Sequence, residues 1–266
     1  MMASELLHEI KQRLAGIGEA YRRALVGPGV IEAGPARGLR FDAGADTVRF
    51  VKGDYEQPVQ QALASLARPG DVCYDIGANL GFFSIVLGRL VGPTGVVHAF
   101  EPVPANAVAI ERNARLNDLD NVCVMRVALT RSDGEAELLL AQHVGGAVLA
   151  DAGTPPDPAG RLTVATAAVD SLLVRGALAP PQLVKIDVEG AEMDVLAGME
   201  RTLREHAPTV VLELDDATQR ECENKVSTCC GFLESLGYHT EPLPNSYRDG
   251  RWYVRHFLAT HKSHDV

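Results

Sequence analysis

A glycine-containing bend and two carboxylates follow short apolar segments of the chain, where a sheet would present them to a ligand. The segment VCYD at 72–75 ends in Asp75 and runs into IGANLG, in which Gly77 and Gly81 let the backbone turn tightly beneath a ligand. The next apolar segment, VVHAF, ends just before Glu101, where a carboxylate can accept hydrogen bonds from both hydroxyls of a ribose. Glycines alone can simply turn a chain, but the combination predicts a nucleoside-binding site.

The glycine spacing distinguishes between nucleoside cofactors. A dinucleotide fingerprint G-x-G-x-x-G aligned on Gly77 requires glycines at 79 and 82, where this chain has Asn79 and Phe82. Asp75 would also lie unfavourably near phosphates, whereas it can hold a cationic amine, or a water bound to one, by Coulomb attraction. We therefore expect S-adenosylmethionine, whose sulfonium and ammonium groups are cationic. A nicotinamide-dependent oxidoreductase is the alternative.

Further carboxylates follow two later apolar segments and are candidates for catalysis. Asp187 and Glu189 follow the strand predicted in QLVKID, and Glu213 ends the strand predicted in PTVVLEL. They could remove the proton of an acceptor hydroxyl or orient the acceptor. Alternatively, Asp187 caps the next helix and Glu189 lies on the surface. With Asp215 and Asp216, Glu213 could also bind Mg²⁺, but clustered acids are as often solvated loop charges, so we favour a site without a metal.

Four further residues could act at the site, and three of them have a purely structural alternative. Tyr55 and Glu56 could close over the methionine end of the cofactor, or they could only anchor an N-terminal cap. His143 is a reserve candidate for the base, because it lies in a long excursion that could fold over the acceptor. His98 lies inside a predicted strand, which favours a packed core residue over a base.

The order of the apolar segments predicts an α/β fold with a parallel sheet buried on both faces. From Val72 to about Leu214, strand-length segments alternate with helical periods, and residues 134 to 164 interrupt this alternation with an excursion typical of a lid or a substrate wall. The predicted strands are VCYDI, VVHAF, VCVMRVAL, QLVKID and PTVVLEL, with GYHTEPL and RWYVRHFLATH as a closing pair. The predicted helices are FFSIVLGRLV, PANAVAIERNARLN, AEMDVLAGMERTLREH and DDATQRECENKVSTCCGFLESLG.

The first part of the chain predicts a smaller unit. Residues 4 to 25 have apolar side chains at helical spacing, and the GPG at 27–29 ends that pattern. The segment LRFDAGADTVRFV indicates two short strands about a glycine-containing turn. A helical period then resumes after Pro58. We therefore place an N-terminal helix and a small β cap at 1–57 and the main domain at 58–266.

Composition limits the partners and the compartment. Of the 266 residues, 25 are Lys or Arg and 35 are Asp or Glu, so the net charge of −10 repels nucleic acid and anionic lipid surfaces. No apolar segment approaches the length of a membrane helix, and the N-terminus lacks the pattern of a secretory signal. Five cysteines without a C-x-x-C pair are typical of a reducing compartment. We expect a cytoplasmic protein without membrane insertion or nucleic-acid binding.

Several motifs in order resemble the FkbM-type S-adenosylmethionine-dependent methyltransferases over roughly residues 53 to 216. They are GDYEQP, DIGANLGFFS, HAFEPVPANAVAIERNARLN, VALTRSDGEAELLL, AVDSLL, LVKIDVEGAEMDVLAGM and TVVLELDD. The resemblance implies a Rossmann-like class I methyltransferase with a seven-stranded, mostly parallel sheet and an antiparallel edge at the last strands. It also implies O-methylation of a hydroxyl on a sugar, glycolipid or secondary metabolite.

The same resemblance assigns the cofactor-binding residues by position. Asp75, Gly77, Asn79 and Gly81 match the cofactor loop. Glu101, with Pro102 after it, matches the ribose site, and Ala128 and Leu129 match the place where adenine usually rests. The expected partner is a small-molecule or glycan hydroxyl acceptor. A module that binds the cofactor without turnover is a third hypothesis, against which only the acids at 187 and 189 argue.

Overall fold

The computed structural model describes residues 27–141, 147–150, 158–247 and 253–264. Its centre is a seven-stranded sheet built from β3 (Val72–Ile76), β4 (Val96–Phe100), β5 (Val122–Met125), β10 (Leu183–Ile186), β11 (Thr209–Asp216), β12 (Tyr238–Pro242) and β13 (Tyr253–His261). The strands lie in the order β12-β13-β11-β10-β3-β4-β5. Neighbours from β5 to β11 are parallel, whereas β13 is antiparallel to both β11 and β12. The predicted α/β fold with an antiparallel edge is confirmed.

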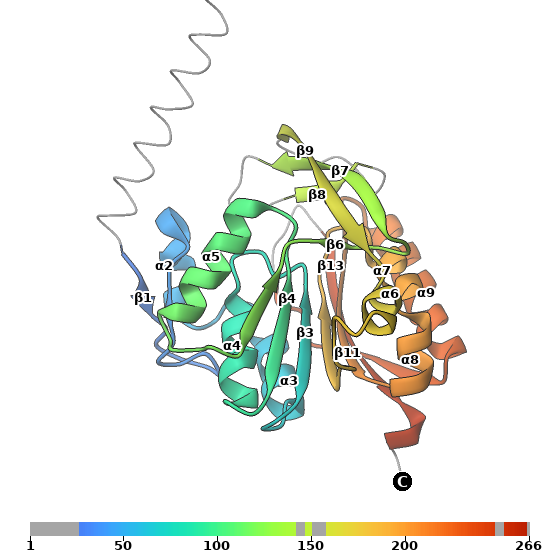
Figure 1. Cartoon of the computed structure of the whole chain (residues 1–266), viewed down its shortest axis with the longest axis horizontal. Coiled ribbons are helices and arrows are strands. Elements are labelled where there is room, and N and C mark those ends of the chain that lie inside the picture. Colours follow the sequence, from blue (N-terminus) through green and yellow to red (C-terminus); the bar gives the residue numbers. More distant parts are fainter. Residues whose placement is uncertain (1–26, 142–146, 151–157, 248–252, 265–266) are drawn as a thin grey trace, which may run out of the picture.

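Helices cover both faces of this sheet, as Figure 1 shows. Side chains of β3 alternate between two apolar clusters, with Cys73 in one and Tyr74 and Ile76 in the other, because successive strand residues point to opposite faces. One face carries α3 (Gln57–Leu66), α4 (Phe82–Val91) and α5 (Pro104–Arg115), and the other carries α6 (Val169–Val174), α7 (Glu192–Gly198), α8 (Glu200–His206) and α9 (Gln219–Ser235). No described helix combines the length and the apolar composition needed to cross a bilayer.

The strand order reverses between β3 and β10, which creates a crevice beyond their carboxyl ends. The chain continues from β3 to β4 and β5 on one side, and β10 and β11 occupy the other. Gly77 follows β3 with a φ of +78°, and a Cβ built there would lie 1.7 Å from the carbonyl oxygen of Asp187. Only glycine can therefore occupy this position without moving the loop after β10.

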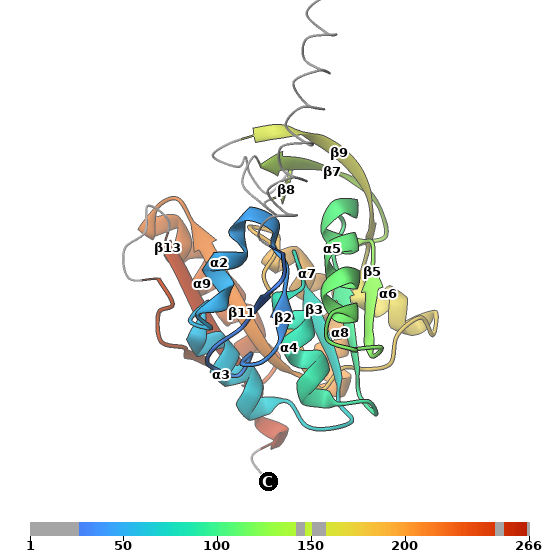
Figure 2. The same cartoon turned by 90° about the vertical axis from the view of Figure 1, so that its left-hand side faces the viewer.

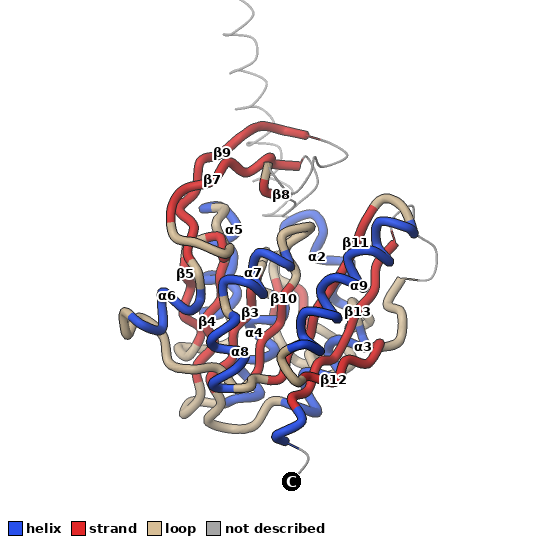
Figure 3. Tube along the Cα trace, turned by 90° about the vertical axis from the view of Figure 1, so that its right-hand side faces the viewer, coloured by secondary structure: helices blue, strands red, loops and turns tan. Residues whose placement is uncertain are grey.

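The predicted strand VCVMRVAL is wrong as a single element. β5 ends at Met125, where the amide of Val127 donates a hydrogen bond back to the Met125 carbonyl at 2.9 Å and turns the chain out of the main sheet. The residues after the turn join a second, four-stranded sheet in the order β6-β9-β7-β8. Its strands are β6 (Ala128–Leu129), β7 (Gly134–Ala141), β8 (Ala147–Leu149) and β9 (Pro158–Ala167). Figure 3 shows β7, β8 and β9 above one end of the main sheet, so the predicted excursion forms a wall there.

The segment LRFDAGADTVRFV contains only one short strand, so the predicted strand pair is wrong in its second half. β1 (Gly29–Val30) pairs with β2 (Arg40–Phe41), and η1 (Gly44–Asp46) and α2 (Thr47–Val51) follow (Figure 2). The hydroxyl of Thr47 accepts a hydrogen bond from the amide of Ala43 and donates one to the carbonyl of Gly44, which favours a helical turn over a hairpin.

The described part of the N-terminal segment packs on the main body. The rings of Phe41 and Phe50 both lie 5.4 Å, centroid to centroid, from the ring of Phe82 on α4. The helix expected at 4–25 lies outside the described residues, and the domain boundary at 57/58 stays a prediction. At the other end of the chain, β13 runs into the short turn η2 (Lys262–His264).

The helix predicted for AEMDVLAGMERTLREH divides into α7 and α8 at Met199. A Cβ on Gly198 would lie 2.0 Å from the carbonyl oxygen of Thr130. Only glycine therefore fits at position 198, where the chain passes close to that carbonyl. The carboxylate of Asp170 accepts hydrogen bonds from the amides of Arg201 and Thr202, both at 2.9 Å, and so caps a new helix. Contacts with residues far away in the sequence therefore break the helix.

The close approach at Gly77 predicts a large cost for adding one methyl group. We expect Gly77→Ala to lower the free energy of unfolding by about 3 kcal/mol or more, because a clash with the Asp187 carbonyl adds to the strain of a left-handed alanine. Gly176→Ala is the matched control, since Gly176 has a φ of +67° but nothing within 4 Å of its built Cβ, and should cost about 1 kcal/mol. Urea unfolding followed by circular dichroism measures both, and equal losses would contradict the close approach.

Candidate active site

A pocket lies at the carboxyl ends of β3, β4, β10 and β11, beneath the second sheet; we call it the first pocket. It is lined by Tyr55, Glu56, Ile76, Gly77, Asn79, Phe100, Glu101, Pro102, Val127, Ala128, Leu129, Leu138, Ala147, Leu149, Asp187, Val188, Glu189, Ala191, Glu213 and Tyr247. An adjoining second pocket extends toward α2 and α4. The two pockets share Tyr55, Gly77, Asn79, Asp187, Glu189 and Tyr247. This shared wall is where two ligands could meet.

The structure brings most of the predicted site residues to the first pocket. The exceptions are Asp75 and Gly81, which lie behind its wall. Asp75 is fully buried, and its carboxylate accepts a hydrogen bond from the Ser84 hydroxyl at 2.5 Å. Burial raises the pKa of Asp75. This geometry therefore does not provide the predicted contact between Asp75 and a cationic amine of a ligand. Gly81, with a φ of +84°, begins α4 against Ile110.

Glu101 presents a fixed carboxylate to the first pocket. One oxygen accepts a hydrogen bond from the amide of Asn79 at 2.9 Å, and the other accepts one from the amide of Val103 at 2.8 Å. The side-chain amide of Asn106 donates a longer bond of 3.4 Å. Burial raises the pKa of Glu101 to about 7, although these donors oppose the shift. The carboxylate is thus oriented by the backbone and remains able to accept hydrogen bonds from a ligand.

A buried lysine that sequence reasoning missed lies between the two acidic strand ends. Lys185 is 3% exposed, and its Nζ lies 3.1 Å from the carboxylate of Asp187, 3.7 Å from that of Asp75 and 4.9 Å from the ring centroid of Phe83. Burial alone would lower the pKa of Lys185, but Asp187 and Asp75 outweigh it and raise the pKa. The sequence signal that could have revealed Lys185 was a charged residue inside the apolar segment QLVKID. Since lysine is rarely buried without a partner, such a residue indicates a buried ion pair.

The loop after β10 presents two carboxylates, Asp187 and Glu189, to the pockets. Asp187 lines both pockets and pairs with Lys185, and the residue that caps α7 is Ala191, so Asp187 is not a helix cap. Glu189 has a φ of +52° and also lines both pockets. A left-handed glutamate costs free energy, and such strain concentrates at functional sites.

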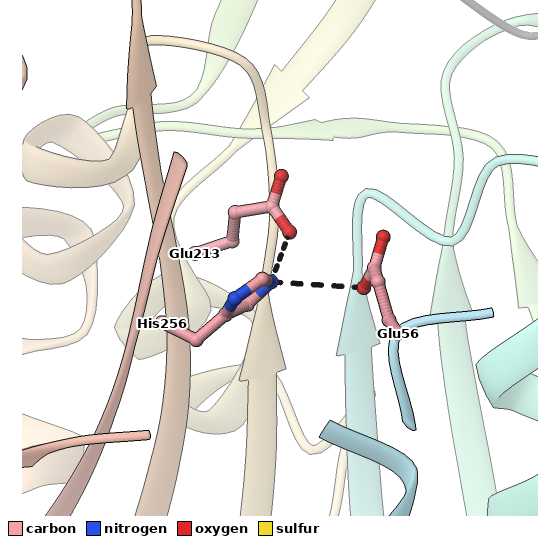
Figure 4. A group of neighbouring side chains, drawn as sticks. All are labelled: Glu56, Glu213 and His256. Carbon is pink, nitrogen blue, oxygen red and sulfur yellow. Dashed lines mark hydrogen bonds and ion pairs between the residues drawn. The ribbon is translucent and has the colours of Figure 1, made fainter. Parts of the chain in front are cut away.

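A second buried group combines predicted and unpredicted residues, as Figure 4 shows. Glu213 on β11 and His256 on β13 are cross-strand partners, and the histidine Nε2 lies 2.6 Å from one oxygen of Glu213. The same nitrogen lies 3.7 Å from Glu56, which begins α3 with a φ of +41°. Tyr247 donates a hydrogen bond of 2.5 Å to the other oxygen of Glu56 and stacks against the His256 ring. The sequence signal for His256 was a histidine in the middle of the strand predicted in RWYVRHFLATH.

The charges in this group perturb one another. Burial would lower the pKa of His256, but its contacts with Glu213 and Glu56 outweigh that and raise it to about 9. Burial and the nearby carboxylates of Asp187 and Glu56 raise the pKa of Glu213 well above its usual range. Perturbed acids in a pocket are typical of functional sites.

The remaining candidates lie elsewhere. Asp216 pairs with Lys225 at 3.0 Å, and neither Asp215 nor Asp216 lines either of the two pockets, so the structure does not place them with Glu213 around one ion. His98 is half-buried on β4, with its ring edge-on to Tyr74. His143 lies outside the described residues.

Comparison with known proteins adds an independent line of argument. The model of the methyltransferase FkbM domain matches residues 75–240. The chain is 28% identical over 187 residues to the hexuronic acid methyltransferase AglP of Haloferax volcanii, covering 68% of this chain and 73% of that protein. It is 28% identical over 175 residues to the 31-O-demethyl-FK506 methyltransferase FkbM of Streptomyces tacrolimicus, covering 56% and 67%.

Among solved structures, the methyltransferase FkbM from Methylobacillus flagellatus superposes with a TM-score of 0.50 at 15% identity, covering 85% of this chain and 62% of that one. At this identity the match supports the fold alone. The family therefore rests on the domain match and the order of motifs, and the solved structure agrees with the fold.

The Lys185 ion pairs predict a pH-dependent loss of stability when the cation is removed. Lys185→Met should lower the free energy of unfolding by about 3–5 kcal/mol at pH 8, because it leaves the buried Asp75 carboxylate without a cation. The loss should shrink at pH 5.5, since Asp75 then takes up a proton more readily in the folded state than in the unfolded state.

The matched control is Lys225→Met, which removes the half-buried cation beside Asp216 and should cost about 1 kcal/mol or less. Urea unfolding at the two pH values measures both variants. A loss for Lys185→Met that is small, or independent of pH, would contradict the role assigned to the buried lysine.

Proposed function

The chain belongs to the FkbM methyltransferase domain family, and on that premise we propose that it transfers the methyl group of S-adenosylmethionine to a hydroxyl oxygen of a sugar or another small molecule. The observation that carries the proposal is the wall shared by the two pockets, because it allows a cofactor and an acceptor to meet beside Asp187. The names of two relatives, a hexuronic acid methyltransferase and an FK506 methyltransferase, favour hydroxyl-bearing acceptors.

The first pocket suits the adenosyl part of the cofactor. Glu101 would accept hydrogen bonds from the ribose hydroxyls, and adenine would lie against Ala128, Leu129 and Leu138. The methionine end would then extend past Gly77 toward Tyr55 and Glu56. Asp187 lines that end, so a sulfonium would be attracted to it.

The reaction is an in-line displacement. The acceptor oxygen forms a bond to the methyl carbon while the bond between that carbon and sulfur breaks, and sulfur keeps the electron pair to give neutral S-adenosylhomocysteine. The hydroxyl proton must leave as the new bond forms. Holding the two reactants in line lowers the barrier by several kcal/mol.

Asp187 is the residue to which we assign the proton. Its carboxylate lies on the shared wall of both pockets, and Lys185 donates a hydrogen bond of 3.1 Å to one of its oxygens. That bond orients the carboxylate and leaves the other oxygen to face the acceptor. Glu189 lies beside it on the same wall and would orient the acceptor. The family match gives no support to the nicotinamide-dependent alternative.

Cofactor affinity should depend on the ionisation of Glu101. Ribose hydroxyls donate to the carboxylate form, whose pKa is about 7, so binding favours the deprotonated state and weakens as the pH falls. We expect the dissociation constant of S-adenosylhomocysteine to be about tenfold larger at pH 6 than at pH 8. Isothermal titration calorimetry across this range measures the effect.

Two variants test whether the pH dependence of cofactor binding comes from Glu101 or from another buried carboxyl group. Glu101→Gln should bind more weakly and lose the pH dependence. Glu192→Gln removes another buried glutamate whose pKa is also about 7 but which does not line the first pocket, and it should retain the wild-type profile. A Glu101→Gln variant with the wild-type pH profile would show that Glu101 does not contact the ribose.

The role of Asp187 predicts a separation of binding from turnover. Asp187→Asn should lower the rate of methyl transfer by about 100-fold while the dissociation constant of the cofactor stays within a fewfold of wild type. Asp194→Asn, which alters a surface carboxylate paired with Arg131, should leave the rate unchanged. Transfer of tritiated methyl groups to uronic acids and macrolide hydroxyls provides the assay. Transfer to none of the acceptor classes tested, together with normal cofactor binding, would favour a non-catalytic module.

A further inference from the structure

Glu56, Glu213 and His256, which we call the Glu–His–Glu cluster, are not needed as the base in the proposed reaction. They come from the start of α3 and from the paired strands β11 and β13, so three distant segments of the chain converge on them. Figure 4 shows the imidazole nitrogen of His256 facing both carboxylates at once. Glu56 and Glu213 also line the first pocket, whereas His256 lies behind them.

The donor atoms are spaced like the ligands of one small cation. One donor atom from each residue lies within 4.8 Å of the others. His256 Nε2 is 2.6 Å from Glu213 and 3.7 Å from Glu56. Two ligands at right angles around an ion, each about 2.1 Å from it, lie about 3.0 Å apart, a value between these two separations. Small side-chain rotations would therefore admit an ion between the three groups.

A buried atom without a hydrogen bond points into the same place. The Oε2 atom of Glu56 is buried and accepts no hydrogen bond within the described part of the chain, and it is the oxygen that faces His256. The Glu56 side chain is only 2% exposed, so this oxygen is shielded from bulk water. Leaving a buried carboxylate oxygen without a donor is costly, and a bound cation would remove that cost.

Lys185 is shared between the cluster and other carboxylates. Its Nζ is 3.1 Å from Asp187 and 3.7 Å from Asp75, and at longer range its charge lowers the pKa of Glu56. Within the cluster, two carboxylates face one imidazole. A divalent ion would displace the protons that the cluster holds and would leave the histidine neutral.

We propose that the Glu–His–Glu cluster binds one divalent transition-metal ion of the Mn²⁺, Co²⁺ or Zn²⁺ class through His256 Nε2 and one oxygen each of Glu56 and Glu213. The mixture of one imidazole and two carboxylates selects this class, because Mg²⁺ and Ca²⁺ prefer oxygen ligands alone. Tyr247 holds the second oxygen of Glu56 and stacks on His256, as residues behind metal ligands commonly do.

Three protein ligands leave coordination positions open toward the first pocket. A metal there acts as a Lewis acid that makes an acceptor hydroxyl easier to deprotonate, and Asp187 on the same wall would take the proton. This role rests on the proposed function, whereas the binding site itself does not. Metal binding can therefore be tested without cofactor or acceptor.

Mn²⁺ binding to the metal-stripped full chain tests the proposal. Electron paramagnetic resonance of free Mn²⁺ should show one site per chain. Because altering residues behind metal ligands already costs 10–100-fold in affinity, Glu56→Gln, Glu213→Gln and His256→Asn should each weaken binding by about 100-fold or more. Glu192→Gln, which changes a glutamate of similar burial outside the cluster, should bind as wild type does. Pulsed measurements on the bound ion should detect a histidine nitrogen that His256→Asn abolishes.

Several outcomes would overturn the proposal. The first is that the wild type binds neither Mn²⁺ nor Co²⁺. The second is that the Glu56→Gln and Glu213→Gln variants bind Mn²⁺ with wild-type affinity, and the third is that the bound ion has no nitrogen ligand. Circular dichroism melts accompany each variant, and the two glutamine variants keep the test valid if His256→Asn does not fold. Specific Mn²⁺ binding without methyl transfer would contradict the proposed function alone, and methyl transfer unaffected by metal removal would contradict the metal's role in it.

Discussion

The pairing of β3 with β10 is the constraint on which the pocket depends. The two strands are parallel, with Asp75 opposite Lys185 in register, and beyond their ends Gly77 lies against the carbonyl of Asp187. The ion pair holds the buried strands at a fixed register, since a slip of one residue would move Lys185 to the other face. The glycine contact then brings the two loops close enough for their polar groups to share one wall.

The buried charges around this pairing have separate surroundings. Glu101 is oriented by backbone amides, Asp75 and Asp187 by Lys185, and Glu56 and Glu213 by His256. Because an unpaired buried charge is unstable, these carboxylates lie beside backbone amides, a lysine or a histidine, and two pairs of them share one such partner. The donors come from elements far apart in the sequence, so the folded chain assembles a site that no single segment contains.

The second sheet and the C-terminal strands complete the enclosure. Leu138, Ala147 and Leu149 form an apolar wall above the carboxylates, and Tyr247 lies on the wall common to both pockets. Closing an acidic pocket with apolar groups strengthens the electrostatic interactions inside it.

The sequence by itself determined the α/β fold, the order of the parallel strands along the chain, and the positions of Gly77, Glu101 and Asp187 at the ends of strands. These features depend on local periodicity and on the rule that parallel strands present their carboxyl ends at one edge. The family also followed from the order of the motifs.

Only the tertiary structure decided that Asp75 faces Lys185 beneath the pocket, that His256 lies opposite Glu213, and that Tyr247 reaches Glu56. It likewise divided the helix at Met199 and the strand after Met125. Apart from the local turn at Met125, each of these features arises from a contact between residues far apart in the chain. Such contacts depend on strand register and on the packing of neighbouring layers, which periodicity within one segment does not encode.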